Sequence, residues 1–290
     1  MSPRLAGRKA IITGANRGFG LAIAAHYLAE GADVALGARD LGLLEIEAAA
    51  LRERFPGRIV LARQLDVASE ASCLDFVAAS TAALGGIDVL VNNAGVYGPM
   101  GAIEDVDWAA WVEAIQVNLI GSVLMARAVL PAMKAQRRGT IIQVSGGGAT
   151  NPMPNITAYA ASKAAIVRFA DSLAFEVAAF GIDVNSIAPG ALNTRLLDEV
   201  LAAGPGKVGA DFYARSLRQR DEGGVALDKG SELAVFLASE AGRGITGKLI
   251  SAVWDRYADW PAHLEQLAGS DLYTLRRITG RDRGAPWGDR

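Results

Sequence analysis

A chain of 290 residues, of which 51% are hydrophobic and 21% charged, is long enough to bury a large core in one or two domains. The formal net charge of −2 leaves no surplus of positive charge for a phosphate backbone, so a nucleic-acid partner is not expected. The only cysteine, Cys73, can neither close an internal disulfide nor form a zinc site alone, which indicates a reducing compartment and no metal site.

The N-terminal segment contains only a short apolar run, which leads directly into a glycine turn and does not resemble a signal peptide. No stretch has about 18 consecutive apolar residues, the length that a membrane span needs. We therefore expect a soluble, cytoplasmic protein with no membrane partner.

Short β-rich runs alternate with longer helical patterns, which is typical of a parallel sheet covered by helices on both faces. The runs are apolar on both sides, as buried parallel strands are. No repeat or Pro/Ser-rich linker divides them, so we expect one α/β domain over residues 1–251, a doubly wound parallel sheet. The expected strands are Lys9–Thr13, Asp33–Ala38, Ile59–Leu65, Val89–Asn92, Thr140–Ser145, Asp183–Ile187 and Lys248–Ser251, and the expected helices span 18–30, 41–54, 69–84, 107–136, 157–180 and 228–239.

Two segments look like additions to this core. In residues 192–226 the sequence AAGPGKVGA interrupts a polar helical pattern, and residues 252–290 form a C-terminal extension rich in Arg and Trp. The aromatic residues of the extension predict that it packs on its own subunit or on a neighbour. They are Trp254, Tyr257, Trp260 and Tyr273.

A glycine-rich turn follows the first expected strand and opens the first helix. Backbone amides and the helix dipole can bind a pyrophosphate there, and glycine lets the backbone approach the phosphates. A tight turn without a ligand would show the same pattern, so the turn alone is weak evidence. Its sequence is Thr13-Gly14-Ala15-Asn16-Arg17-Gly18-Phe19-Gly20.

This turn resembles the cofactor turn of the short-chain dehydrogenase/reductase family, and further landmarks follow in the family's order over about residues 5–251. The resemblance implies a Rossmann fold that binds NAD(P), with residues 192–226 as a substrate lid. It also implies that Asp66 and Val67 contact the adenine and that the motif Asn92-Asn93-Ala94-Gly95 supports the sheet along the cofactor. Pro189, Gly190 and Thr194 are implied to hold the nicotinamide carboxamide, and Gly14, Asn16, Arg17, Gly18, Phe19 and Gly20 to form the phosphate turn.

The end of the second strand should decide between NADP and NAD. Enzymes that prefer NAD place an acid there for the ribose hydroxyls, and Ala38 occupies that place here. Arg39 and Arg17 could pair with a 2′-phosphate, which favours NADP. NAD is the alternative: Asp40 would be the ribose acid if the register slips by two, and Arg39 would then be a solvated turn residue.

Tyr159 and Lys163 are four residues apart in a helical stretch, so their side chains share one face. An adjacent ammonium and the positive nicotinamide would favour the phenolate, which makes Tyr159 a general acid for reduction and a general base for oxidation. An ordinary amphipathic pair would have the same spacing. The resemblance implies that Lys163 also holds the nicotinamide ribose and that Asn118 anchors a water connected to the lysine.

One position departs from the family pattern. The family has a serine thirteen residues before the tyrosine, where it hydrogen-bonds the substrate, and this chain has Gly146. Ser145 is one residue earlier and is our candidate catalytic serine, although side chains alternate along a strand. Thr150 or Asn151 could act instead, or the substrate could be oriented without a serine.

The lid is basic although the chain is slightly acidic, which leads to the hypothesis of an anionic substrate; solvated charges would give the same composition. Gly204, Gly206 and Gly209 could act as its hinges. The resemblance implies a homodimer or homotetramer formed through the helices over 107–136 and 157–180. The basic residues of the lid are Arg195, Lys207, Arg215, Arg218 and Arg220.

Three functions are compatible with these residues. The first is an NAD(P)-dependent oxidoreductase that acts on a small secondary alcohol or ketone, which Asn118, Tyr159 and Lys163 favour. The second, favoured by Gly146, is a cofactor-binding sensor or scaffold that has lost turnover. The third is a lyase or epimerase that uses tightly held NAD transiently; cofactor that survives purification would support it.

Overall fold

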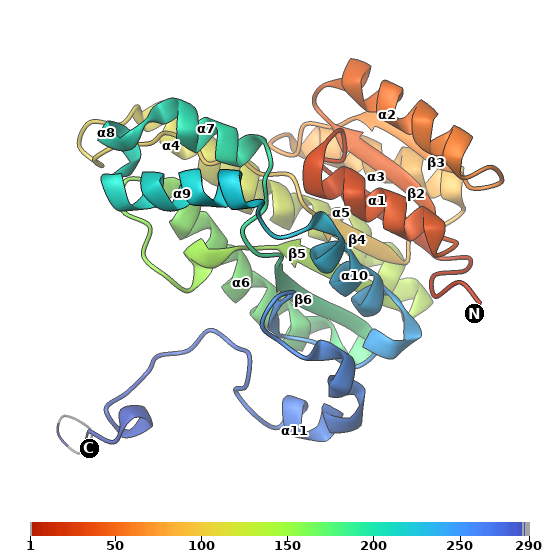
Figure 1. Cartoon of the computed structure of the whole chain (residues 1–290). Helices are drawn as coiled ribbons and strands as arrows, with labels where there is room; N and C mark the ends of the chain where they lie inside the picture. Colours follow the sequence, from red (N-terminus) through yellow and green to blue (C-terminus); the bar gives the residue numbers. More distant parts are fainter. Residues whose placement is uncertain (1, 286, 288–290) are drawn as a thin grey trace.

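The computed structural model describes residues 2–285 and 287 of the chain. Seven strands form one parallel sheet in the order β3-β2-β1-β4-β5-β6-β7 (Figure 1). The order reverses between β1 and β4, and in doubly wound sheets ligands bind at this point, outside the carboxyl ends of the strands. The strands are β1 (Lys9–Thr13), β2 (Asp33–Ala38), β3 (Val60–Gln64), β4 (Val89–Asn92), β5 (Gly139–Val144), β6 (Ile182–Ala188) and β7 (Leu249–Ser251).

Alternate residues of each strand enter two cores on opposite faces of the sheet. Ile12 belongs to a cluster with side chains of α1, α2 and α10, whereas Ile11 belongs to a cluster with side chains of α3, α5 and α6. The expected doubly wound fold is thus confirmed. The helices are α1 (Gly18–Ala29), α2 (Leu41–Arg54), α3 (Glu70–Leu84), α4 (Trp108–Ile115), α5 (Gly121–Gln136), α6 (Thr157–Val177) and α10 (Leu227–Ala238).

Helices α4 and α5 form one continuous helix, Trp108–Gln136, joined by a π-helical turn at Gln116–Ile120. By length and composition alone this helix is long and apolar enough to cross a membrane, a test that the buried core helix of a folded domain also passes. Within the fold 44% of its apolar window is buried, and Met125 and Met133 lie in the core. The helix is therefore a core element of the α/β sandwich.

Three helices form the segment expected to be the substrate lid, near the carboxyl edge of the sheet: α7 (Arg195–Ala203), α8 (Pro205–Val208) and α9 (Ala210–Glu222) (Figure 1). The sequence indicated a helical pattern interrupted by glycines, and Gly204 and Gly209 lie at the two breaks with φ of 78° and 86°. Positive φ is accessible to glycine at little cost, which explains why the helices end there.

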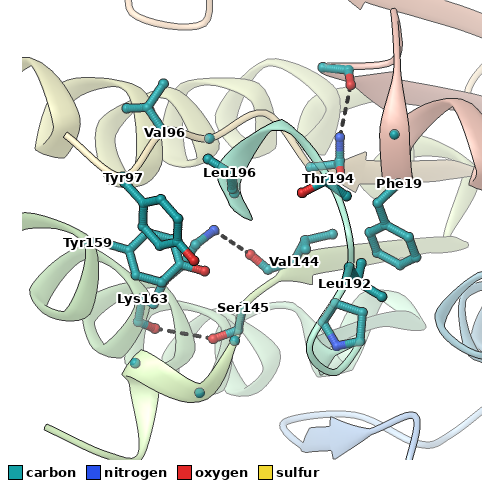
Figure 2. A pocket seen from close by; sticks show the side chains of 18 of the residues that line it. Phe19, Val96, Tyr97, Val144, Ser145, Tyr159, Lys163, Leu192, Thr194 and Leu196 are labelled. Carbon is teal, nitrogen blue, oxygen red and sulfur yellow. Dashed lines mark hydrogen bonds between the residues drawn. The ribbon is translucent and has the colours of Figure 1, made fainter. Parts of the chain in front are cut away.

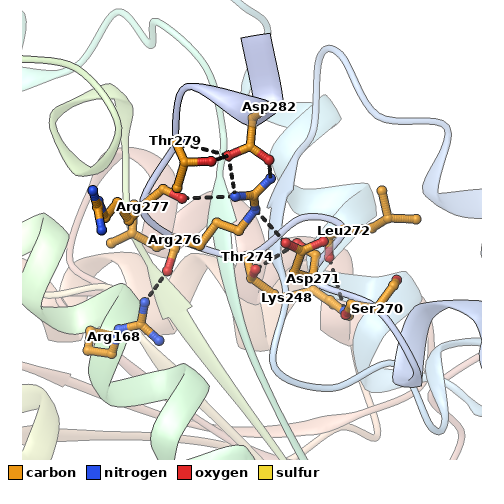
Figure 3. Close-up of polar contacts among 11 residues, drawn as sticks. Arg168, Lys248, Ser270, Asp271, Leu272, Thr274, Arg276, Arg277, Thr279 and Asp282 are labelled. Atoms are coloured by element: carbon orange, nitrogen blue, oxygen red, sulfur yellow. Dashed lines mark hydrogen bonds and ion pairs between the residues drawn. The ribbon is translucent and has the colours of Figure 1, made fainter. Parts of the chain in front are cut away.

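The extension begins with a 3-10 helix (Tyr257–His263) and α11 (Leu264–Ala268), then returns along the sheet edge. Leu249 N of β7 donates to Tyr273 O, and Lys248 Nζ donates to Leu267 O. Lys248 Nζ also donates to the carbonyls of Ser270 and Leu272 (Figure 3). Residues 252–275 therefore pack on their own subunit. Residue 1 of the expected domain, and 286 and 288–290 of the expected extension, lie outside the described residues.

The last turns of the extension extend away from the sheet (Figure 1). Arg276 forms ion pairs with Asp271 and Asp282, and Arg168 of α6 donates to the carbonyl of Leu275 (Figure 3). These contacts fold the segment on itself and attach it to α6.

Candidate active site

A cavity of about 1400 Å³ runs along the carboxyl ends of the strands, from the glycine turn after β1 to the lid. It lies where the strand order reverses, the place in which doubly wound folds bind dinucleotides. The sequence-predicted residues that line it are Gly14, Asn16, Arg17, Gly18, Phe19, Arg39, Asp66, Val67, Asn93, Ala94, Gly95, Ser145, Tyr159, Lys163, Pro189, Gly190 and Thr194.

The glycine turn is locked to the loop after β4. Thr13 Oγ1 accepts hydrogen bonds from the backbone N–H groups of Asn93 and Ala94, and Asn93 Nδ2 donates to the carbonyls of Thr13 and Gly14. A Cβ on Gly14 would lie 2.8 Å from Ala94 Cα, and one on Gly20 would lie 2.5 Å from Asn93 Nδ2. Gly20 thus permits close packing between the two turns, and α1 begins beside them at Gly18, with its N-terminal amides at the cavity.

Strand β2 ends at Ala38, in the register expected from the sequence. Asp40 accepts a hydrogen bond from Leu43 N at 3.0 Å and caps α2, so its carboxylate is engaged at the helix start. Arg39 lies between them, with its side chain 60% exposed and its nearest guanidinium nitrogen 3.7 Å from a carboxylate oxygen of Glu113. The cavity therefore has an exposed cation at the end of β2, and Arg17 of the glycine turn lines it as well.

Tyr159 and Lys163 lie on the same face of α6, but the ammonium does not point at the phenol. Lys163 Nζ donates to Val144 O at 2.7 Å and lies 5.6 Å from the centroid of the Tyr159 ring (Figure 2). Burial lowers the pKa of Lys163 to about 8.

The pKa of Tyr159 shifts in the direction opposite to the one expected from its lysine neighbour. Removal of the phenol from water raises its pKa, and the nearby Tyr97 raises it further. Desolvation of the phenol outweighs the Lys163 ammonium, which is bound to Val144 O, and the expected effect of the lysine together with the nicotinamide on the phenolate stays a prediction. Tyr159 is accordingly protonated at neutral pH, the form that donates a proton.

Asn118 lies in the π-helical turn, and its side chain holds the loop after β4. Its Nδ2 donates to Val96 O at 2.8 Å and to Ser162 Oγ at 2.9 Å, and its Oδ1 accepts from Val96 N at 2.8 Å. Gly95 lies next to it, since a Cβ there would be 3.2 Å from Asn118 Oδ1 and 3.6 Å from Lys163 Nζ. Asn118 thus connects the cofactor loop to the helix that carries Tyr159 and Lys163.

The Tyr159 hydroxyl lies close to the position of the family's serine. A Cβ on Gly146 would lie 2.9 Å from Tyr159 Oη, so a side chain there would require the phenol to shift. Ser145 is buried, and its hydroxyl donates to the main-chain carbonyl of Lys163 at 3.4 Å (Figure 2). Thr150 and Asn151 line the cavity but hydrogen-bond each other and Gly147 O.

Sequence reasoning missed Tyr97, which lines the cavity beside Tyr159. The two rings meet edge to face, with centroids 4.6 Å apart, and Figure 2 shows their hydroxyls side by side. An aromatic residue two positions after Gly95, in a loop at the carboxyl edge of the sheet, was the available signal. Burial raises the pKa of Tyr97 to about 12.

The lid begins against the cofactor turn. A Cβ on Gly18 would lie 3.6 Å from Thr194 Cγ2, and Gly190, with φ of 99°, approaches Val225 and Val253 so closely that a Cβ would lie 2.9 Å from each. After β3, Asp66 Oδ1 accepts a hydrogen bond from the backbone N–H of Ala68. These contacts bring both expected ends of the cofactor site to one cavity.

The chain is similar to known dehydrogenases over most of its length. A family model described as short chain dehydrogenase matches residues 8–203. The chain is 32% identical over 248 residues to 2-(S)-hydroxypropyl-CoM dehydrogenase 3 of Xanthobacter autotrophicus, covering 85% of this chain and 95% of that one. It is 32% identical over 263 residues to D-beta-hydroxybutyrate dehydrogenase of Cupriavidus necator, covering 89% and 99%. A crystal structure of NAD+-bound xylitol dehydrogenase superimposes with a TM-score of 0.78 at 26% identity, covering 86% and 98%.

Proposed function

Because the chain belongs to the short-chain dehydrogenase/reductase family, an NAD(P)-dependent group of oxidoreductases acting on CH–OH groups, we propose that Tyr159 and Lys163 serve its reaction with a secondary alcohol or ketone. The observation that carries the proposal is the Tyr159 hydroxyl, which lies on the cavity wall between the glycine turn and the lid. Lys163 stands one helical turn away on the same face.

The bound nicotinamide supplies or accepts the hydride. Tyr159 Oη donates its proton to the carbonyl oxygen during reduction and takes it back from the alcohol during oxidation. Lys163 is a buried cation of the site, and its Nζ donates a hydrogen bond to Val144 O at 2.7 Å. Its positive charge favours the tyrosinate that remains after the proton has left.

NADP is the proposed cofactor, with NAD as the alternative. Ala38 offers no carboxylate to repel a 2′-phosphate, Asp40 is engaged as a helix cap, and Arg39 and Arg17 line the cavity. The similar xylitol dehydrogenase was solved with NAD+, so family membership alone does not choose between the two.

An anionic substrate is the second part of the proposal. A second cavity of about 520 Å³ adjoins the first and is lined by Arg215 and Asp211 of α9. None of the ion pairs within residues 2–285 involves Arg215, whose guanidinium lies 5.7 Å from the Phe212 ring centroid. One relative acts on hydroxybutyrate, which carries a carboxylate. Turnover of an anionic alcohol should fall in Arg215→Glu and stay unchanged in Arg218→Glu, because Arg218 lines neither cavity.

The experiment that tests the function follows nicotinamide absorbance with NADPH and NADH against ketones, alcohols and hydroxy acids. Tyr159→Phe should abolish turnover while leaving cofactor binding intact. Tyr257→Phe is the matched control, because Tyr257 packs against Phe236 away from the cavity. Equal turnover in wild type and Tyr159→Phe would contradict the proposed role of the phenol.

The alternative, a cofactor-binding sensor, is favoured by Gly146, which removes the family's hydroxyl from the site. Tight cofactor binding with no turnover across the panel would support it.

The homodimer or homotetramer also stays a proposal: Trp108 of α4 and Phe175 of α6 are 67% and 81% exposed on the two helices expected at the interface. Light scattering of Trp108→Glu and Phe175→Glu tests that assembly.

A further inference from the structure

We propose that the Tyr97 hydroxyl is the second hydrogen-bond donor to the reacting oxygen of the substrate and does the work that a serine at position 146 would do. The inference rests on the proposed function, since it needs a carbonyl or alcohol at Tyr159.

This chain lacks the usual donor and has no close substitute nearby in the sequence. Gly146 has no hydroxyl, and a Cβ there would lie 2.9 Å from the Tyr159 phenol oxygen. The Ser145 hydroxyl faces the Lys163 carbonyl. Thr150 and Asn151 are bonded to one another at 3.0 Å. A donor to the substrate oxygen has therefore to come from another element.

Tyr97 lies beside Tyr159 on the wall of the cavity. Its ring meets the Tyr159 ring at 63° with centroids 4.6 Å apart, and both hydroxyls end at the same part of the cavity (Figure 2). Among residues 2–285 and 287, neither hydroxyl is hydrogen-bonded to another protein group. Two free phenol donors that converge on one point can bind one oxygen between them, as two donors do in an oxyanion hole.

The loop is held in place on both sides of Tyr97. Val96 exchanges two hydrogen bonds with the Asn118 side chain, each at 2.8 Å. Gly98 has φ of 74° and packs so closely that a Cβ would lie 2.6 Å from Ala114 Cβ. A donor held in place before the substrate arrives loses little entropy on binding, which is what transition-state stabilisation requires.

The protonation state of the Tyr97 hydroxyl also suits a hydrogen-bond donor. The wall of the cavity raises the pKa of Tyr97 to about 12, so the hydroxyl keeps its proton at neutral pH. Tyr97 thus donates a hydrogen bond without supplying the transferred proton, which comes from Tyr159.

The test compares Tyr97→Phe with Tyr97→Leu in ketone reduction. Tyr97→Phe keeps the ring contact with Tyr159 and removes only the oxygen, so we expect kcat to fall about 10²-fold, as for loss of one oxyanion donor. Cofactor Kd and Tm should stay unchanged. Tyr97→Leu should lose the same activity and, because it also removes the ring, some stability. Wild-type turnover in Tyr97→Phe would overturn the inference, above all if Tyr97→Leu is inactive, since the ring alone would then matter.

A second readout separates donation from packing. A ketone substrate analogue and the matching analogue without the oxygen are compared as inhibitors of reduction. Wild type should prefer the ketone, and Tyr97→Phe should lose most of that preference; an unchanged preference would contradict the donor role. If Tyr159→Phe also retains full activity, the proposed function fails; if Tyr159→Phe is inactive and Tyr97→Phe is normal, only this inference fails.

Discussion

Gly146 lies tightly against the Tyr159 hydroxyl: a Cβ on Gly146 would lie 2.9 Å from Tyr159 Oη, so one of the two would have to shift. Gly146 has an extended backbone with φ of 171°, so a side chain is compatible with the backbone and would meet the phenol. The glycine at position 146 therefore leaves room for the tyrosine hydroxyl. Restoring a side chain should disturb the site rather than repair it.

Gly146→Ala should lower kcat because the new methyl group displaces the Tyr159 hydroxyl. A misplacement of about 1 Å can cost about 10²-fold in rate, which sets the upper limit of the expected fall, because a smaller shift relieves the contact. Gly147→Ala is the matched control, since a Cβ on the next residue meets nothing within 4 Å. Steady-state kinetics of both variants at saturating cofactor decide the matter. Normal kcat in Gly146→Ala would mean that the phenol does not need this space.

Removal of Arg39 should weaken NADPH binding more than NADH binding. A hydrogen bond between charged groups contributes about 1.5–3 kcal/mol, so Arg39→Ala should raise the Kd for NADPH by about 10- to 10²-fold. Arg63→Ala is the control, because Arg63 pairs with Asp75 on the outside of the sheet and does not line the cavity. Fluorescence titration with both nucleotides measures the effect. An equal loss for NADH and NADPH would contradict a 2′-phosphate contact.

The protonation of Lys163 should limit reduction at alkaline pH. Burial places its pKa at about 8, below its ordinary value, so the ammonium is complete well below pH 8 and is lost as the pH rises through 8. The pKa of Tyr159 is shifted upward, so the phenol keeps its proton across the same range. The profile of kcat/KM, which reports the free enzyme, should therefore fall above about pH 8. A flat profile between pH 7 and 9 would show that the lysine charge is not needed.

The core elements could be predicted closely from the sequence, and the contacts inside the site could not. Strands such as Lys9–Thr13 and Asp33–Ala38 are found at their expected bounds, because buried parallel strands need apolar residues on both faces and end where the turn residues begin. The placement of Tyr97 depends on Asn118, 21 residues later, through hydrogen bonds that no periodicity reveals. The direction of the Lys163 ammonium is likewise set by the carbonyl of Val144, in strand β5.

Lys248, a buried cation immediately before β7, helps to attach the extension to the sheet. Its Nζ donates to three carbonyls at 2.7 Å, 3.2 Å and 3.0 Å, those of Leu267, Ser270 and Leu272 (Figure 3). Lys248→Met keeps the aliphatic stem and leaves these acceptors without a donor. Each unpaired buried polar group costs about 1–3 kcal/mol, so the segment from Leu267 to Leu272 should detach locally.

Two measurements follow from that detachment. Limited trypsin digestion should cut the extension of Lys248→Met faster than that of wild type, while the Tm of the core changes less. Tyr273 directly follows Leu272, the last residue that Lys248 holds, and it lines the cavity, so the KM for the alcohol or ketone should rise as well. Arg276→Lys is the control, because Arg276 is exposed and its ion pairs with Asp271 and Asp282 lie outside the cavity. Unchanged digestion and an unchanged KM in Lys248→Met would show that the extension is held by its other contacts, such as the packing of Trp260 against Tyr273 at 4.2 Å between ring centroids.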